Sequence, residues 1–156
     1  MGGTVVLVII VVFIVIVSGY MAFNVNYTKA FRVKNKVVDS FNKYGDICKT
    51  PGSPCDIEIT EYAKSVGYGS TEFGASCDGK LLDDSDIRTL HSGADGLYCY
   101  AEFEKDVTKG DETVISDGEY HYYTIITKVD INIPLIEDSL GLRYLTVRGD
   151  TKTFKK

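Results

Sequence analysis

Residues 5–17 read Val-Val-Leu-Val-Ile-Ile-Val-Val-Phe-Ile-Val-Ile-Val, and Ser18 to Phe23 continue this stretch without a charged side chain. The first charge in the chain is Lys29. About 20 apolar residues cross a bilayer core of about 30 Å, and in lipid the backbone must form its hydrogen bonds within the segment. Val5 to Phe23 is therefore predicted to be a transmembrane helix, in spite of its many β-branched residues.

The alternative to a retained anchor is a cleaved signal peptide. A signal peptide usually has a basic N-terminal region and ends at a cleavage site with small residues. Met1-Gly2-Gly3 carries no basic side chain, and no such site follows the apolar stretch. The sequence therefore favours an anchor that is kept.

Helical spacing continues beyond Phe23. Apolar side chains recur in steps of three and four residues, as on one face of a helix, at Phe23, Tyr27, Ala30, Phe31, Val33, Val37, Val38, Phe41 and Tyr44. No proline occurs before Pro51, and Gly45-Asp46 suits a helix end. The pattern predicts one helix of about 60 Å from about residue 4 to about residue 44. Its first half is apolar all round and its second half is amphipathic.

The rest of the chain has the patterns of short strands. Alternation with a period of two predicts strands at 97–104 and 121–133, and further strands are expected at 142–148 and 151–154. A short helix is expected at 56–66, with Thr60 as its N-cap and Gly67 at its end, and a helical turn at 83–90.

The predicted fold class is α+β, with the long N-terminal helix packed on a small antiparallel sheet. Three parts are expected: a transmembrane half of the helix at 1–23, its amphipathic half at 24–45, and an extracellular, mostly β domain at 46–156. The amphipathic half is the expected cover for one face of the sheet.

Charge is distributed unevenly along the chain. Residues 29–43 have a net charge of +4, whereas residues 44–156 have a net charge of −9. The basic strip, defined as Lys29, Arg32, Lys34 and Lys36, suits anionic lipid headgroups beside the anchor. The acidic remainder argues against a nucleic acid partner.

The basic strip and the four cysteines give opposite signals about orientation. Positive residues beside a transmembrane helix usually lie in the cytoplasm. Cys48, Cys55, Cys77 and Cys99 instead favour an oxidising compartment outside the cell. Four cysteines allow three connectivities. The turn-rich loop between the first two favours Cys48–Cys55, which leaves Cys77–Cys99.

No catalytic, cofactor or metal site is predicted. His91 and His121 have no metal-ligand spacing to another His or Cys, and phosphate-binding and dinucleotide-binding motifs are absent. The acidic residues Asp83, Asp84 and Asp86 lack the glycine and distal glutamate of a calcium-binding loop. The chain is therefore expected not to be an enzyme.

Two features favour a binding surface instead. Tyrosines gather at 98–100 and 120–123, and tyrosine suits both protein interfaces and ordinary exposed strand faces. Arg148-Gly149-Asp150, expected in a turn between strands, matches a tripeptide that some adhesion receptors bind. A binding surface of this kind predicts a surface receptor, of unknown identity, as a partner.

In its order of elements the chain resembles the pilin-like superfamily, and most of all the TadE-like pseudopilins of tight-adherence pilus systems in their Gram-positive form. Three stretches carry the resemblance: the anchor Val5–Phe23, residues 26–36 directly after it, and the C-terminal residues 122–136 with 145–152.

The resemblance implies a structural subunit at a bacterial cell surface, held in the membrane or in a filament. Its partners would be membrane lipid and copies of itself or related subunits. These would pack against the N-terminal helix, through Val5, Val8, Val12, Val15, Gly19, Phe23, Tyr27 and Phe31. Pilins usually carry a Glu five residues into the mature helix, and cleavage after Gly2 or Gly3 would leave none in the first dozen residues. This departure favours a minor or accessory subunit. The alternative function is an anchored adhesion domain that does not form filaments.

Overall fold

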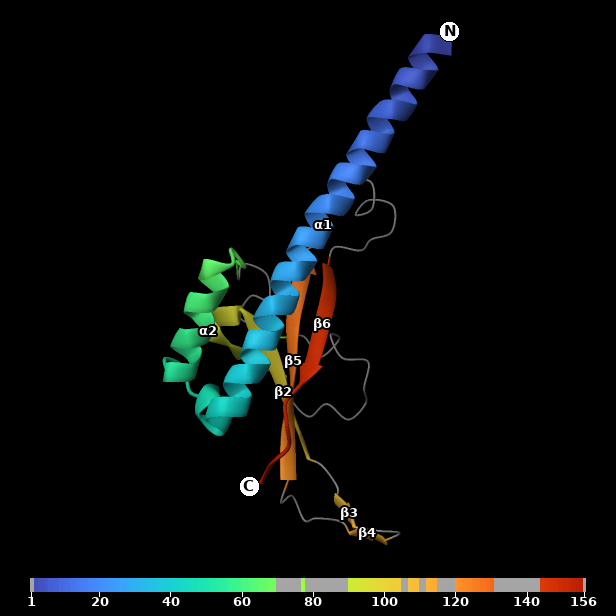
Figure 1. Ribbon diagram of the computed structural model, residues 1–156. Coiled ribbons are helices and arrows are strands. Elements are labelled where there is room, and N and C mark those ends of the chain that lie inside the picture. The colour runs from blue at the N-terminus through green and yellow to red at the C-terminus, as the bar shows by residue number, and fades with distance from the viewer. Residues whose placement is uncertain are drawn as a thin grey trace.

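The computed structural model describes residues 2–69, 77, 90–104, 107–109, 112–114, 120–130 and 144–155. One helix, α1 (Gly2–Tyr44), runs without interruption from the N-terminus into the globular part (Figure 1). At 1.5 Å per residue it is about 65 Å long. Gly45 follows with a φ of +58°, the left-handed conformation that glycine adopts readily at a helix end. The predicted single helix and its end are therefore confirmed.

Two short helical elements follow α1. They are the 3₁₀ helix η1 (Gly45–Lys49) and the α-helix α2 (Pro54–Ser65). The N-cap of α2 is Ser53, whose side chain accepts a hydrogen bond from the Asp56 amide, and Pro54 occupies the first turn. The predicted N-cap Thr60 is therefore wrong, because Ser53-Pro54 starts the helix earlier. The end at Gly67, with φ +66°, agrees with the prediction.

A five-stranded antiparallel sheet forms the rest of the core. Its strands are β1 (Leu90–Gly93), β2 (Tyr98–Glu104), β5 (Tyr120–Asp130), β6 (Tyr144–Asp150) and β7 (Phe154–Lys155), with the 3₁₀ helix η3 (Ala94–Gly96) between the first two. The order is β1-β2-β5-β6, and β7 pairs with the start of β5. A separate hairpin joins β3 (Val107–Lys109) and β4 (Glu112–Val114). The helical turn expected at 83–90 lies outside the described residues, apart from Leu90 in β1.

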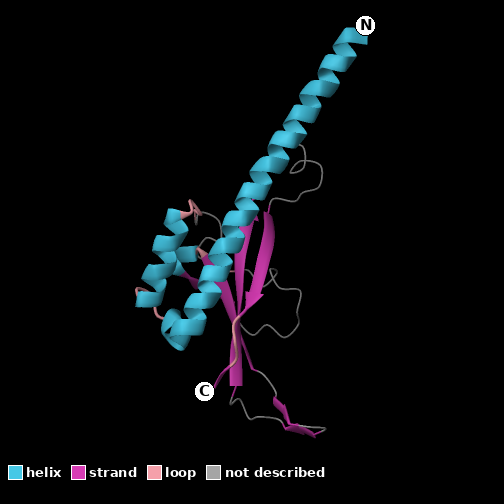
Figure 2. Ribbon diagram, viewed as in Figure 1, coloured by secondary structure: helices cyan, strands magenta, loops and turns pink. Residues whose placement is uncertain are grey.

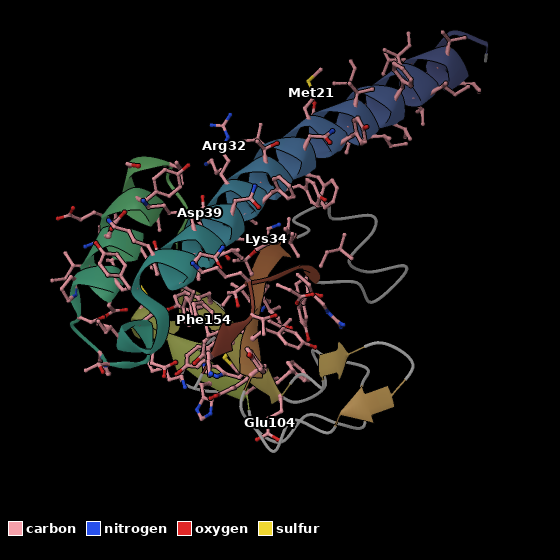
Figure 3. The ribbon with its side chains drawn as sticks, turned by 60° about the horizontal axis from the view of Figure 1, so that its bottom comes forward. Met21, Arg32, Lys34, Asp39, Glu104 and Phe154 are labelled. Carbon is pink, nitrogen blue, oxygen red and sulfur yellow. A yellow bond between two sulfur atoms is a disulfide. The ribbon has the colours of Figure 1, made fainter. Side chains whose placement is uncertain are left out.

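Both helices lie on one side of this sheet (Figure 2). The C-terminal half of α1 places Ala30, Val33, Val37 and Phe41 against it, all of them fully buried. On β5 the alternate residues 121, 123, 125, 127 and 129 belong to the covered face. The α+β class and the packing of the amphipathic half on the sheet are therefore confirmed.

The tyrosines occupy an unexpected place. Tyr98 and Tyr123 are fully buried and Tyr100 nearly so, and all three surround the ring of Phe41 with centroid separations of 5.1–6.0 Å. For these three tyrosines neither expectation, an interface or an exposed strand face, is correct, whereas Tyr120 and Tyr122 are only partly buried. Their rings form the core beneath α1, because the face of β2 that carries Tyr98 and Tyr100 is the one that the helix covers.

The opposite face of β2 is also buried at its start. Cys99 and Ala101 pack with Ile126, and Leu90 and Phe103 lie against them. The strand is therefore buried on both faces over Tyr98–Ala101 and becomes one-sided only from Glu102 onward.

We expect Phe41→Ala to lower the free energy of unfolding of the globular part by about 3–5 kcal/mol, since it removes a fully buried ring from an aromatic cluster. Phe31→Ala, on the same helix but with 42% of its surface exposed, is the control and should cost about 1 kcal/mol or less. Denaturant titration of the detergent-solubilised chain measures both, and equal losses would contradict the packing described.

Candidate functional site

The N-terminal half of α1 projects beyond the sheet (Figure 1). Its large apolar side chains are open on all sides of the helix: Leu7 is 63% exposed, Phe13 66% and Met21 64%. The first fully buried residue of the helix is Ala30. The segment is long and apolar enough to cross a membrane, and none of its residues is buried by the described part of the chain. Such a surface is unfavourable in water and favours contact with lipid tails or with other apolar helices.

The eight residues predicted to form the membrane and assembly helix fall into three groups. Val5, Val8, Val12 and Val15 are exposed on the projecting half, and Gly19 beside them is partly covered. Phe23 is partly buried and packs against the cluster of Ala30, Val129 and Val147. It therefore marks the level at which the globular part begins.

Tyr27 and Phe31 form the third group. The sequence placed them on the same face as Ala30 and Val33, but they remain 43% and 42% exposed. Their rings continue from Phe23 as a row one turn apart, with centroids 6.2 and 6.3 Å apart, and Lys34 Nζ lies 4.3 Å from the Phe31 centroid. The sheet thus covers only part of the apolar stripe of α1, and an aromatic row on its flank stays largely exposed.

The basic strip does not form one outward patch. Lys34 is buried, and its side chain runs over Gly149 so closely that an added Cβ there would lie 2.6 Å from Lys34 Cδ. Lys36 forms an ion pair with Glu58 of α2, and Lys29 Nζ lies 3.4 Å from the Gly67 carbonyl oxygen. Only Arg32 of the four projects into solvent without a recorded partner in the described part of the chain. Most of these charges therefore have contacts within the folded chain.

Glu58 joins α1 to α2. It accepts hydrogen bonds from Lys36 and from the Tyr44 hydroxyl at 3.0 Å, and Lys43 Nζ lies at 3.5 Å. The hydrogen bond from Lys36, followed by that from Tyr44, lowers the pKa of Glu58 from 4.5 to about 2. The periodicity of 56–66 does not distinguish Glu58 from Glu61. Only the contact between α1 and α2 gives Glu58 its partners.

A second polar cluster joins η1 to the sheet. Asp46 accepts a hydrogen bond from the Tyr123 hydroxyl and lies 3.4 Å from His121 Nε2, while Lys49 bridges Asp46 and Glu102 at 3.5 and 2.8 Å. The hydrogen bond from Tyr123 lowers the pKa of Asp46, and burial raises the pKa of Tyr123. His121 is 3% exposed and stacks on Phe154. The cluster holds η1, which directly follows α1, against β5 and β2.

Within the described residues no group of His, Cys, Asp or Glu is arranged to hold a metal ion. His91 stacks on Tyr100 at the sheet edge, away from His121. The predicted absence of catalytic activity stays a prediction.

The chain has one disulfide within the helical layer and one on the sheet. Cys48 pairs with Cys55, which links η1 to α2, and Cys77 pairs with Cys99 on β2. This is the connectivity that the turn-rich loop favours. Disulfides fit a domain in an oxidising compartment outside the cell.

The Arg-Gly-Asp tripeptide lies inside β6 and not in a turn. Arg148, Gly149 and Asp150 pair with Ile126, Ile125 and Thr124 of β5. Gly149 is covered by Lys34, and Asp150 accepts a hydrogen bond from Thr124 at 2.6 Å. The expected turn is therefore wrong, and the glycine is explained by the close approach of Lys34.

Comparison with protein families, with curated proteins and with solved structures finds no match for this chain. The molecule is therefore classified by its architecture alone. It is an α+β domain built on the second half of a helix whose first half is a candidate membrane anchor.

We expect Val12→Lys, near the middle of the apolar stretch, to reduce stable membrane insertion by about 100-fold, since a lysine at the bilayer centre costs about 2.5–3.5 kcal/mol. Asn35→Lys, on the exposed side of α1 that faces away from the sheet, adds the same charge outside the stretch and is the matched control. Carbonate extraction of membranes measures the retained fraction. Release of a mature chain that begins beyond Phe23 would show a cleaved signal instead.

We expect acid to weaken the contact between α1 and α2. Because the pKa of Glu58 is lowered, its contribution to stability is fully present above pH 4.5 and is lost as the pH falls toward 2. The difference in unfolding free energy between the native chain and Glu58→Gln should therefore shrink over that interval. Glu61→Gln, an exposed neighbour on α2, serves as the control and should show no such change. A difference that does not change with pH would contradict this role of Glu58.

Proposed function

We propose that this chain is a pilin-like structural subunit of a bacterial cell-surface filament, or of the system that assembles one. The observation that carries the proposal is the division of α1. One half is uncovered and apolar on every side, and the other half is fixed rigidly in a folded domain. The apolar half satisfies its surface in a bilayer before assembly and among identical helices afterwards. The exchange replaces lipid contacts with packing contacts, which are similar in kind.

The way the globular part is attached supports this proposal. The sheet and α2 contact α1 only from about Phe23 onward, and the described residues leave the preceding turns clear (Figure 1). No glycine-rich or proline-containing hinge separates the two halves, because α1 is continuous from Gly2 to Tyr44. A neighbour packing against the apolar half would therefore also fix the position of the globular part. This coupling suits a subunit of an ordered array better than a flexible tether.

The proposed location is a single membrane span with the domain outside, or an extracellular filament. The two disulfides favour the outside. The basic strip directly after the span remains the opposing signal.

The alternative proposal, an anchored adhesion domain, keeps less of its support from the sequence. The clustered tyrosines at 98, 100 and 123 are core residues, and Arg148-Gly149-Asp150 is paired within the sheet. What still favours it is the missing Glu near the N-terminus of the helix.

The proposal is tested by shearing surface filaments from cells that produce the chain and identifying their subunits by mass spectrometry. We expect the full globular part in the filament fraction, with peptides joined through Cys48–Cys55 and Cys77–Cys99 in a digest without reductant. Filaments from cells lacking the gene are the control for contamination. Detection only as a detergent-soluble monomer, in cells whose filaments are intact, would contradict the proposal.

A further inference from the structure

The two flanks of α1 beside the sheet differ in composition. Figure 1 shows α2 on one side of α1 and β6 on the other. At about 100° per residue, Lys29, Lys36 and Lys43 lie on the α2 side, and all three have polar partners on α2 or directly after it. The β6 side instead carries the rings of Tyr27 and Phe31, which stay largely exposed. The helix is therefore polar on one flank and aromatic on the other.

Exposed apolar side chains continue onto the start of β6. Tyr144 and Leu145 are 43% and 41% exposed. Leu145 points to the same face of the sheet as Val147, because the two are separated by one residue along a strand, and Val147 packs with Ala30 of α1. Tyr144 points to the other face. Since β6 is the last strand in the order β1-β2-β5-β6, both side chains lie at the edge of the sheet that flanks α1.

These four side chains stand out against the rest of the described domain. Beyond the apolar span, the large apolar side chains that are exposed in the described part of the chain are Val25, Tyr27, Phe31, Ile47, Ile57, Tyr144 and Leu145. Val25, Ile47 and Ile57 are on different elements or faces, and single exposed residues of this kind are ordinary. The other four gather on one side of the molecule. We refer to Tyr27, Phe31, Tyr144 and Leu145 as the β6 flank.

Two rings of the β6 flank have a lysine above them. Lys34 Nζ lies 4.3 Å from the ring centroid of Phe31, and Lys128 Nζ lies 4.2 Å from that of Tyr144. Lys34 has no ion pair within the described part of the molecule, whereas Lys36 on the α2 side is paired. Aromatic rings with long cationic side chains beside them are typical of the membrane–water interface, where the rings lie among the headgroups and the cations reach the phosphates.

The β6 flank begins at the level where the apolar span ends. Phe23, the last residue of the span, packs against Val129 and Val147, and Leu145 pairs with Val129. Tyr27 is about one turn, or about 6 Å, beyond Phe23. The headgroup layer on each side of a bilayer core is about 5–8 Å thick. Tyr27 and Leu145 therefore reach the headgroup layer when Phe23 lies at the edge of the core.

We propose that the β6 flank rests in the headgroup layer of an anionic membrane, so that the domain lies against the bilayer with its β6 side and keeps its α2 side toward water. The inference rests on the membrane-held state in the proposed function and adds to it the rotation of the subunit about α1. A tilt of α1 by about 20° toward this flank, an average value for membrane helices, also brings Phe31 toward the headgroups.

The distribution of carboxylates supports this orientation. The α2 side carries Asp56, Glu58 and Glu61, which an anionic surface repels. On β6 the described carboxylate is Asp150, which accepts a hydrogen bond from Thr124. It lies at the opposite end of the strand from Tyr144, about 20 Å farther from the membrane. The end of β6 nearest the bilayer is therefore the part that suits anionic headgroups.

Tryptophan fluorescence tests the contact, because the chain contains no tryptophan of its own. The full-length chain is reconstituted in vesicles of phosphatidylcholine and phosphatidylglycerol. We expect a spin label on the lipid headgroups to quench Phe31→Trp and Leu145→Trp about threefold more strongly than Ile57→Trp. Ile57 is the matched control, since it is also exposed but lies on α2. Phe13→Trp, within the span, should be quenched by brominated acyl chains instead.

The charge of the membrane is tested in the Leu145→Trp background. Lys34→Met/Lys128→Met keeps both apolar stems and removes both ammonium groups, and it should lower headgroup quenching about twofold. Vesicles of phosphatidylcholine alone should have the same effect. The matched control is Lys64→Met/Lys152→Met, which removes two exposed charges outside the β6 flank and should change nothing. Quenching that is unaffected by the loss of both lysines and of the anionic lipid would overturn the preference for an anionic surface.

The outcomes separate this inference from the proposed function. Strong headgroup quenching at the two β6-flank positions, with little at Ile57→Trp, supports the inference once intact disulfides and an unchanged thermal midpoint show that each variant is folded. Equal quenching at all three positions overturns it and leaves the proposed function standing. Quenching that disappears as the chain is concentrated in the same lipid assigns the flank to a second copy and also overturns it. If brominated chains do not reach Phe13→Trp, the span is absent, and the membrane-held state in the proposed function fails as well.

Discussion

The contact between the second half of α1 and the covered face of β5 determines how everything else in the molecule is arranged. Phe41 inserts among Tyr98, Tyr100 and Tyr123, and farther along the helix the Thr127 hydroxyl donates a buried hydrogen bond to the Ala30 carbonyl at 3.1 Å. The first contact supplies apolar and aromatic burial, and the second fixes the helix along its axis because a buried hydroxyl cannot lose its partner cheaply. With α1 held in this way, α2 and η1 pack along its flank and at its end, and β7 pairs with β5 beside that end.

Helix and sheet could be predicted because their signals are local. The spacing of Val33, Val37 and Phe41 and the alternation along β5 each describe one face of one element. The positions of the tyrosines were wrongly predicted for a physical reason. A tyrosine has an apolar ring with a polar tip, so it suits either the core or an exposed strand face. Both faces of β2 are buried at Tyr98–Ala101, so alternation there carries little information. Gly149-Asp150 was expected in a turn from its composition, although the glycine serves the passage of Lys34 instead.

The candidate site was predictable as a surface but not in its details. Apolarity alone identified Val5–Phe23, since a run of this length has few other uses. The role of each lysine in the basic strip depends on where α2 and β6 come to lie, and those are contacts between residues distant in sequence. Lys36 and Arg32 are one turn apart and look equivalent in the sequence, yet one pairs with Glu58 and the other faces solvent. Net charge therefore overstates how much positive surface is available to lipid.

The continuity of α1 has a mechanical consequence. With its apolar half in a bilayer, as proposed, a helix about 65 Å long that is fixed to the domain at one end would act as a lever, and its angle would set the position of the globular part. Membrane helices tilt by about 20° on average, and more when the bilayer is thin. A tilt of that size carries the far end of such a rod sideways by about 20 Å. Lipid composition would thus be translated into the position of the globular part above the membrane, with no bend in the chain to absorb the change.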